Sequence, residues 1–509
     1  MRDCGILFPI FSLPSKFEVG SFSKEAYEFI DFLTEASVGY WQILPIGPTG
    51  FGDSPYQAVS AFAGNPYFVS PEELINEGLL TWDEAYSFDF GNDEQVVDYG
   101  ALYNNRYALL EIAYHRFIEQ GLNNSKEYKA FLKEHAYWLD DYTLFMVIKK
   151  SVNGKSWLEW DTPLKNHDEK ALEKFKKENA EMIDFYSFIQ YKFNEQYVKL
   201  RTYANNKGVK IIGDIPFYTA LDSVDVWAHK EVFLMNKNGT PKVVAGCAPD
   251  DFSPTGQLWG NPIYDWKALK ENDYDWWMKR LERSFEVYDT LRIDHFHGFN
   301  EYYAIPYGDT TAENGKAHKG PGADFFKAYE KKFGKIDPSK SMNIIAEDLG
   351  TITKENVKLL TDFNIPGMKI LEYAFTSWQS IYLPYFHTNN AVVYPGTHDN
   401  APLRAWLEEI SDTERKFVKD YINSGNEDYG AITWDLIREC YKSVCNLCIV
   451  PLYDYLCKGN EARINRPGTA TDNWKWRLQP NFLSHELAYS MAHLASTYGR
   501  VPEYKKEIK

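Results

Sequence analysis

Short apolar segments recur along the chain and alternate with longer stretches of helical periodicity. Eight of them are candidate strands, most bounded by Gly, Pro or Asn: 5–8, 40–44, 209–213, 290–293, 343–346, 368–371, 391–393 and 447–450. Helical patterns such as 23–36 and 354–362 lie between them. Buried strands that alternate with helices are typical of a parallel sheet. Eight such strands predict an α/β fold, a (β/α)8 TIM barrel.

An open, doubly wound sheet is the alternative architecture for this alternation. Such sheets often bind a dinucleotide at a glycine-rich turn after the first strand. No predicted strand here is followed by a G-x-G-x-x-G sequence. The closed barrel is therefore favoured.

The predicted strands are unevenly spaced. About 165 residues, from 44 to 209, separate the second strand from the third, and a single crossover needs far fewer. This stretch is mostly helical in pattern, so we expect an inserted, mainly helical subdomain at about 68–205. A second insertion, about 224–288, is rich in Asn, Pro, Trp and Asp and predicts a loop-rich subdomain over the active site. Residues 1–509 would otherwise form a single barrel domain.

Charge and hydropathy exclude two classes of partner. The formal net charge is -17, and no Lys/Arg-rich run offsets it, so no nucleic-acid partner is expected. No apolar stretch approaches the roughly 20 residues of a membrane span, so no membrane partner is expected either. The N-terminal segment lacks the length and cleavage site of a signal peptide. We therefore expect a cytoplasmic protein.

Four of the six cysteines lie close together near the C-terminal end of the chain: Cys440, Cys445, Cys448 and Cys457. Cys445 and Cys448 have a C-x-x-C spacing. No second pair and no histidine partner follows, so a zinc or redox site is disfavoured. Buried, reduced thiols are expected, as in most cytosolic proteins of this size.

Acidic residues follow the predicted strands at several places. They are Asp214, Asp294, Glu347 with Asp348, and Asp399. In a (β/α)8 barrel the C-terminal strand ends converge on the active site. One acid alone is more often a helix cap or a loop charge. Several acids, each ending a buried strand, indicate a carboxylate-lined active site.

Two of these acids have the setting that acid/base chemistry requires. Arg292 and Asp294 are two residues apart on one strand, so their side chains point the same way. We expect the guanidinium to lower the pKa of Asp294 and keep it ionised as a nucleophile; a structural ion pair is an equally good interpretation. Asp348 should point to the opposite side from Glu347. Burial near other carboxylates would raise the pKa of Glu347 and suit it to general acid catalysis, as in glycoside chemistry.

Other chemistries also use clustered acids. Phosphoryl transfer would need a phosphate-binding loop, and the chain has no G-x-x-x-x-G-K-[ST] sequence. His295, His297 and His398 could join Asp294 and Asp399 in a metal site, but their spacing matches no zinc pattern. Aromatic residues make up 16% of the chain, which fits either an aromatic core or a sugar-binding cleft. A glucan-binding protein without catalytic activity is a further alternative.

Seven short motifs follow one another along the chain. They are 52–56 (GDSPY), 213–216 (GDIP), 255–262 (TGQLWGNP), 291–296 (LRIDHF), 346–350 (AEDLG), 396–400 (GTHDN) and 462–468 (ARINRPG). Together they resemble the catalytic segments of the α-amylase superfamily. More narrowly, they resemble the amylomaltase family of 4-α-glucanotransferases (disproportionating enzymes), glycoside hydrolase family 77. The resemblance extends from about residue 5 to about residue 478.

The resemblance implies a retaining double displacement on a barrel without a C-terminal β-sandwich. Asp294 would be the nucleophile, Glu347 the acid/base and Asp399 a third carboxylate that binds sugar hydroxyls. The residues expected to bind substrate are Ser54, Tyr56, Asp214, Trp259, Arg292, His398 and Asn465, with Trp259 on the acceptor side. The family uses neither a metal nor an organic cofactor.

The same resemblance implies a substrate. The donor would be a maltooligosaccharide or another α-glucan, and the acceptor would be the 4-hydroxyl of a glucan or glucose. An α-1,4-glucan hydrolase on the same scaffold is the alternative. The oligomeric state and the preferred chain length do not follow from the sequence.

The chain departs from the family pattern at three places. His297 stands where arginine is expected, Ala401-Pro402 stands where Asp-Thr is expected, and Ala248 replaces a proline. The three carboxylates are retained. The departures concern acceptor-side contacts and chain-length preference, so bond cleavage is the firmer part of the prediction.

Overall fold

Eight parallel strands form the centre of the protein. The computed structural model describes residues 2–50, 52–249, 253–337, 344–350 and 353–506. The strands are β1 (Asp3–Leu7), β2 (Tyr40–Gln42), β3 (Lys210–Ile215), β6 (Thr290–Ile293), β9 (Ile344–Ala346), β10 (Gly367–Ile370), β11 (Ala391–Tyr394) and β12 (Leu447–Pro451). Each overlaps one of the predicted strands; residue 343 of the fifth lies outside the described residues. The prediction of eight strands is confirmed.

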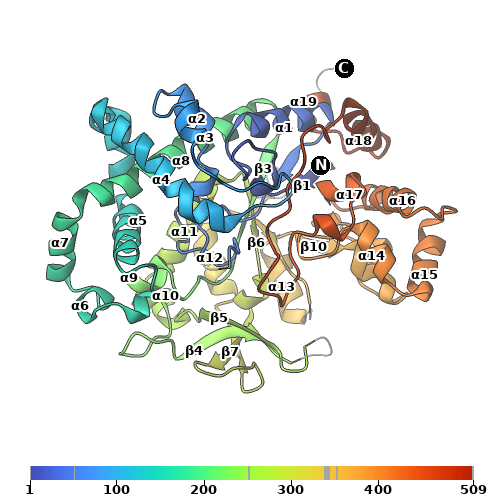
Figure 1. The fold of residues 1–509 in the computed structure, drawn as a ribbon. Coiled ribbons are helices and arrows are strands. Elements are labelled where there is room, and N and C mark those ends of the chain that lie inside the picture. Colours follow the sequence, from blue (N-terminus) through green and yellow to red (C-terminus); the bar gives the residue numbers. More distant parts are fainter. Residues whose placement is uncertain (1, 51, 250–252, 338–343, 351–352, 507–509) are drawn as a thin grey trace.

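The strands are arranged as a nearly closed barrel. Their order is β10-β11-β12-β1-β2-β3-β6-β9, and every pair is parallel. Two hydrogen bonds connect the ends of this order, β9 and β10. The N–H of Ala346 donates to the carbonyl of Pro366 (2.9 Å), and the N–H of Met368 donates to Asp348 Oδ1 (2.7 Å). The helices surround the strands in Figure 1, so the (β/α)8 prediction is confirmed.

Both faces of these strands are buried, which explains the unbroken apolar runs in the sequence. Leu7, Ile212, Ile345 and Val392 belong to a cluster of fully buried side chains contributed by strands on different sides of the barrel. Alternate residues, such as Ile6, pack in the larger cluster that includes helix residues. Truncating Ile345 to Ala would cost about 2–5 kcal/mol of stability.

The region between β2 and β3 is helical. After α1 (Lys24–Glu35) and β2 come α2 (Pro71–Asn76), α3 (Trp82–Tyr86), α4 (Tyr99–Glu119), α5 (Lys126–Ser151), α6 (Thr162–Lys165), α7 (Glu169–Glu178) and α8 (Ala180–Asn206). The helical structure is interrupted at Asn179, which has non-helical backbone angles and lies between α7 and α8. That this region is a separate inserted subdomain stays a prediction.

A small antiparallel sheet lies beside the barrel, at the lower edge of Figure 1. Its order is β5-β4-β7-β8, with β4 (Val243–Cys247), β5 (Gln257–Pro262), β7 (Glu301–Pro306) and β8 (Lys316–Lys319). The second predicted insertion thus contains strands as well as α9 (Val224–Ala228), α10 (Trp266–Glu271) and α11 (Asp275–Val287). The sequence analysis did not predict this sheet, because β8 is exposed throughout and has no apolar alternation.

The remaining helices follow the later strands. They are α12 (Ala323–Phe333), α13 (Lys354–Asp362), α14 (Leu403–Glu409), α15 (Asp412–Ile422), α16 (Tyr429–Lys442), α17 (Leu452–Tyr455), α18 (His485–Thr497) and α19 (Glu503–Lys506). Within the described part of the chain, no helix has the length and apolar character that crossing a membrane requires.

Candidate active site

The C-terminal strand ends bring the predicted carboxylates to one end of the barrel. Asp294 follows β6 and Glu347 follows β9, whereas Asp214 lies inside β3 rather than after it. The N–H of Asp294 donates to Ile215 (2.9 Å), and the N–H of Glu347 donates to Ile293 (3.0 Å). These bonds continue the parallel pairing past the strand ends and hold the carboxylates side by side.

Arg292 connects two of these carboxylates. It pairs with Asp214 across the strands, and its Nη1 atom lies 2.5 Å from Asp214 Oδ2 and 3.0 Å from Asp294 Oδ1. Arg292 and Asp214 are almost fully buried, whereas the side chain of Asp294 is 29% exposed. One guanidinium is therefore shared between a buried carboxylate and one that is open to the cleft.

The pKa of Asp294 differs from the sequence expectation. Burial raises it, the Arg292 guanidinium lowers it and Asp399 raises it again, so that the net shift is upward. The arginine acts in the predicted direction, but the prediction of a lowered pKa is wrong because burial outweighs it. Burial likewise raises the pKa of Asp214 to about 7, against the effect of Arg292.

Glu347 is held by two backbone N–H groups. His295 N donates to its Oε2 at 2.8 Å, and Leu349 N donates to its Oε1 at 3.0 Å. His295 has a left-handed backbone (φ 49°), which is unusual for a non-glycine residue. Burial and the charge of Asp294 raise the pKa of Glu347 to about 8, against Arg292 and the two N–H groups. The upward direction agrees with the sequence prediction and favours the protonated form of Glu347.

Asp399, on the loop after β11, is held by two polar side chains. Asn465 Nδ2 donates to Asp399 Oδ1 at 2.6 Å, and His398 Nε2 lies 3.4 Å from Asp399 Oδ2. The N–H of Asn465 also donates to the carbonyl of His398 (3.1 Å). Burial lowers the pKa of His398 to about 4, so this imidazole is neutral at pH 7.

Tyr56 links the two sides of the site. Its hydroxyl donates to Asp214 Oδ2 (2.9 Å) and lies 2.8 Å from His398 Nε2. Its ring stacks on the His398 imidazole, with centroids 5.3 Å apart and planes 13° apart. Ser54 lies in the same turn, where its hydroxyl accepts the N–H of Tyr56 at 3.3 Å.

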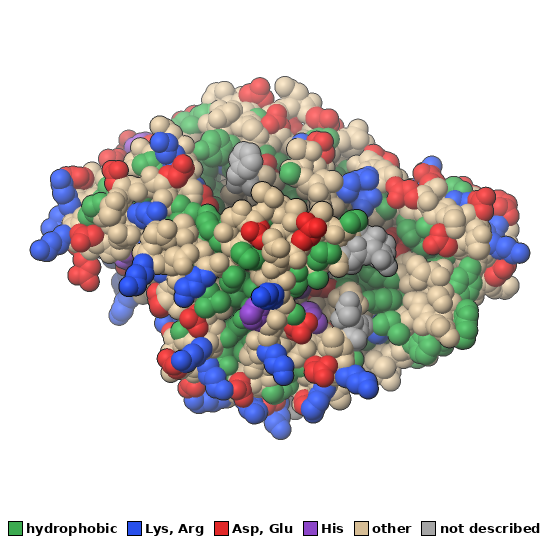
Figure 2. All heavy atoms as spheres, turned by 90° about the horizontal axis from the view of Figure 1, so that it is seen from below, with side chains coloured by type: hydrophobic (Ala, Val, Ile, Leu, Met, Phe, Trp, Pro, Cys, Tyr) green, Lys and Arg blue, Asp and Glu red, His purple; other side chains and the backbone are tan. Residues whose placement is uncertain are grey.

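Trp259 lies on β5, close to the same strand ends. Its ring is perpendicular to the imidazole of His295, with centroids 4.8 Å apart, and its Nε1 donates to Gln257 at 3.1 Å. Because His295 directly follows Asp294, the antiparallel sheet lies against the catalytic end of the barrel. Figure 2 looks onto this face and shows hydrophobic, acidic and histidine side chains meeting in the hollow near its centre.

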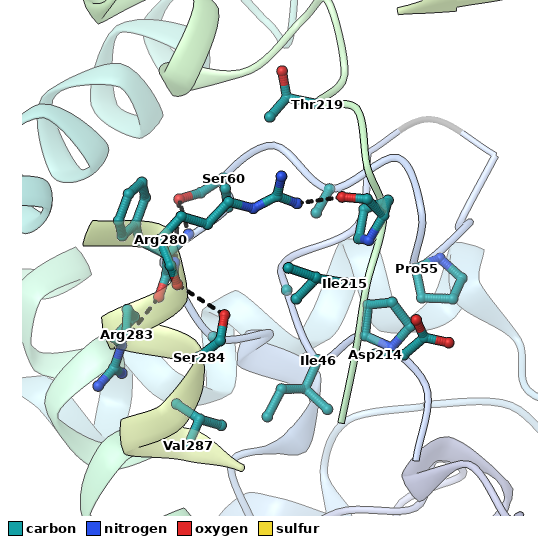
Figure 3. Close-up of a pocket in the computed structure, with 18 of the residues that line it drawn as sticks. Ile46, Pro55, Ser60, Asp214, Ile215, Thr219, Arg280, Arg283, Ser284 and Val287 are labelled. Carbon is teal, nitrogen blue, oxygen red and sulfur yellow. Dashed lines mark hydrogen bonds between the residues drawn. The ribbon is translucent and has the colours of Figure 1, made fainter. Parts of the chain in front are cut away.

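A cavity of about 70 Å³ lies behind Asp214. In Figure 3, Asp214 and Pro55 are on one side of it, and Arg280 and Ser284 of α11 are on the other. Arg280 donates from Nη2 to the carbonyl of Pro216 (2.6 Å) and from Nη1 to that of Phe217 (3.2 Å). It thereby fixes the chain immediately after Asp214.

Several residues that fix the loop of Asp399 were not predicted from the sequence. Asn400 Oδ1 accepts the N–H of Thr397 (2.9 Å), Asn400 Nδ2 donates to the hydroxyl of Tyr373 (3.3 Å), and the Tyr453 hydroxyl donates to the carbonyl of Thr397 (3.0 Å). Tyr373 and Tyr453 follow the ends of β10 and β12. The rule that singled out the acids, position after a strand, would have found both tyrosines.

The metal-site alternative gains no support. Among the residues that the structure describes, no group of three or more His, Cys, Asp or Glu side chains is arranged to hold a metal ion. His297 forms a short hydrogen bond with Asn356. Cys440, Cys445 and Cys448 are buried free cysteines, as the sequence predicted, whereas the free Cys457 is only partly buried.

Comparison with known proteins gives a consistent result. A family model described as 4-alpha-glucanotransferase, of glycoside hydrolase family 77, matches residues 8–484. The 4-alpha-glucanotransferase of Clostridium butyricum is 44% identical over 494 residues, covering 96% of this chain and 99% of the relative. That of Thermus thermophilus is 40% identical over 511 residues, covering 98% and 99%.

A solved structure agrees with these relatives. The amylomaltase from Streptococcus agalactiae in complex with acarbose matches with a TM-score of 0.94 and 38% identity, covering 98% of this chain and 100% of that chain. The match therefore includes the barrel, the helical region after β2 and the antiparallel sheet. The chain belongs to glycoside hydrolase family 77, the 4-alpha-glucanotransferases.

Proposed function

We propose that Asp294, Glu347 and Asp399 carry out the glucan transfer of this family by a retaining double displacement. A segment of a maltooligosaccharide would move to the 4-hydroxyl of an acceptor glucan or glucose. The observation that carries the proposal is the contrast between two neighbouring carboxyl groups. Asp294 lies 3.0 Å from a guanidinium, whereas the pKa of Glu347 is raised to about 8.

In the first step Asp294 attacks the anomeric carbon of the donor. The bond from that carbon to the leaving glucan's 4-oxygen breaks, and Glu347 gives its proton to this oxygen. The product is a glucosyl ester of Asp294. Arg292 favours the ionised form of Asp294 over the protonated form, although burial opposes it. Protonated Glu347 and ionised Asp294 avoid having two negative charges side by side.

In the second step the acceptor's 4-hydroxyl attacks the same carbon. Glu347, now ionised, takes the hydroxyl proton, and the ester bond to Asp294 breaks. Two inversions give net retention. Water in place of the sugar hydroxyl would give hydrolysis, the alternative activity on this scaffold.

The donor pocket offers buried polar atoms to sugar hydroxyls. Asp214 Oδ1, Arg292 Nε and His398 Nδ1 are buried and have no hydrogen-bond partner among the described residues. Buried polar groups are rarely left unpaired, because each costs about 1–3 kcal/mol. We propose that substrate hydroxyls pair with these atoms. Ser54, Tyr56 and Asn465 complete the pocket, and Asp399 binds hydroxyls of the distorted ring.

Trp259 is proposed to cover the acceptor side. Its place beside His295, next to both Asp294 and Glu347, suits a ring that excludes water from the glucosyl-enzyme. The similar amylomaltase from Streptococcus agalactiae was solved in complex with acarbose. We propose that the corresponding cleft here takes an α-glucan. A cytoplasmic location is proposed from the buried free thiols, which are typical of proteins in a reducing compartment.

Incubation with maltotriose tests the proposal. Transfer produces glucose and longer oligosaccharides while the total of reducing ends stays constant. Hydrolysis raises the reducing ends and forms no longer chains. If hydrolysis is observed, the protein is an α-1,4-glucan hydrolase and not a transferase. If no reaction is observed, the remaining assignment is a glucan-binding protein without catalytic activity.

A further inference from the structure

Exposed aromatic side chains gather on the segment that follows β10. Residues 371–386 lie between β10 and β11 and include η7 (Leu371–Thr376) and η8 (Pro384–Phe386). Trp378 is 70% exposed, Tyr385 59% and Phe386 47%. Contiguous exposed apolar surface usually marks an interaction site. We call Tyr373, Trp378, Ile381, Tyr385 and Phe386, all exposed, the aromatic ledge.

The ledge is anchored to the protein and held in shape. Beneath it, buried Phe375 packs against Phe417 and Tyr421 of α15, with ring centroids 6.0 Å and 5.7 Å away. Ser380 Oγ donates to the carbonyl of Tyr373 (2.8 Å), and the Tyr385 hydroxyl donates to the carbonyl of Trp378. Rings that are fixed before a ligand arrives cost less entropy on binding.

The ledge continues directly from the active site. Tyr373 accepts a hydrogen bond from Asn400, the residue after Asp399. The segment also follows β10 directly, and in β10 the N–H of Met368 donates to Oδ1 of Asp348, the residue after Glu347 (2.7 Å). The ledge therefore starts beside the Asp399 loop and next to the strand end that carries Glu347.

The chemistry of the ledge is neutral. From residue 373 to residue 398 the sequence contains no Asp, Glu, Lys or Arg, whereas charged side chains are spread over most of the face in Figure 2. The exposed polar side chains among the aromatics are Thr376, Ser377 and Gln379. Nucleic acids and anionic membranes attract Lys and Arg, which are absent here. A glucan offers apolar ring faces and hydroxyl groups without charge, which matches both features.

We propose that the aromatic ledge is a binding site for long α-glucans outside the catalytic cleft. Sugar rings of the acceptor or leaving chain stack on Trp378 and Tyr385, while Thr376, Ser377 and Gln379 form hydrogen bonds with hydroxyls. This inference rests on the proposed function. It adds a dependence on chain length, because only a chain that extends past Tyr373 and out of the cleft would contact Trp378 and Tyr385.

Trp378→Ala and the double variant Trp378→Ala/Tyr385→Ala test the ledge. With long-chain amylose, KM should rise about 3- to 10-fold in the single variant and further in the double variant, the range expected for lost aromatic contacts. With maltotriose, kcat and KM should stay at wild-type values. Trp378→Phe keeps a ring and should recover most of the amylose affinity. Tyr489 is on α18 and is 73% exposed, so Tyr489→Ala is the matched control. This variant should leave kcat and KM unchanged for both amylose and maltotriose.

Three results would overturn the inference. If KM for amylose is unchanged in both the single and the double variant, the ledge does not bind glucan. An equal rise in KM for maltotriose and amylose means that the ledge merely supports the cleft. A wild-type dimer that dissociates in the double variant by sedimentation velocity, with amylose KM unchanged, assigns the surface to a second copy of the chain. Failure of the wild type to disproportionate maltotriose would instead refute the proposed function.

Discussion

The backbone N–H of His295 lies 2.8 Å from Oε2 of Glu347. The residue after the proposed nucleophile therefore holds the proposed acid/base. His295 itself has a left-handed backbone (φ 49°). The two steps of the reaction need these carboxyl groups at a fixed separation, and this hydrogen bond is one direct connection between them.

Glu347→Gln should abolish transfer between natural glucans. Removal of a general acid/base lowers rates by about 10²–10⁴-fold, and here the group acts in both steps. With α-glucosyl fluoride, whose leaving group needs no proton, the first step should persist and the glucosyl-enzyme should accumulate. Burst kinetics of fluoride release measure this. Equal losses with fluoride and maltotriose donors would show that Glu347 has a different role.

The activity should fall on the alkaline side as Glu347 loses its proton. Its pKa is raised to about 8, so the free enzyme is competent below that pH, and kcat/KM for maltotriose should decline through it. In the Glu347→Gln variant this limb should disappear from the residual fluoride reaction. A wild-type profile that stays flat to pH 10 would contradict the assignment.

The same shift predicts a dependence of stability on pH. A carboxyl group whose pKa is higher in the folded than in the unfolded state stabilises the fold at low pH. This contribution is lost as pH rises from the unfolded value toward about 8. Between pH 5 and pH 9, wild type should therefore lose more Tm than Glu347→Gln does. Parallel Tm curves for the two proteins would argue against a buried, protonated Glu347.

Tyr56→Phe should weaken donor binding. The variant removes the hydroxyl that donates to Asp214 and lies near His398, but it keeps the ring that stacks on the imidazole. Loss of a buried hydrogen bond to a charged group costs about 1.5–3 kcal/mol, which corresponds to about 10- to 150-fold in kcat/KM. Kinetics with maltotriose measure it. Tyr67→Phe, also buried, is the matched control and should leave kcat/KM unchanged.

Trp259→Ala should shift the reaction from transfer toward hydrolysis. The indole lies against His295, and its loss would admit water to the glucosyl-enzyme. The ratio of free reducing ends to longer oligosaccharides, measured from maltotriose, should rise. Gln257→Ala removes the hydrogen-bond partner of the indole without removing the ring and should change the ratio less. An unchanged ratio in Trp259→Ala would refute the covering role.

The barrel was predictable because its strands are buried on both faces. Segments such as 391–393 and 447–450 are continuous apolar runs, and β11 and β12 formed where expected. The sheet of β4, β5, β7 and β8 was not predictable. Val243 pairs with Pro306, far along the chain, and the Lys316–Lys319 strand has no buried face.

The candidate site also has features that could be predicted from the sequence and features that could not. Position after a strand is a local property of the sequence, and it singled out Asp294, Glu347 and Asp399 as candidates. The balance between burial and Arg292 at Asp294 is a property of the folded environment, and its net direction was predicted wrongly. The contact from His295 N to Glu347 joins residues 52 positions apart in the sequence, so no local pattern specifies it.

Mass spectrometry of the trapped intermediate tests the central claim most directly. Glu347→Gln is incubated with α-glucosyl fluoride, digested, and searched for a peptide carrying one glucosyl unit. We expect the label on Asp294, and Asp294→Asn should abolish it. A label on Asp399 or Asp214, or turnover without any labelled peptide, would contradict the double displacement proposed here.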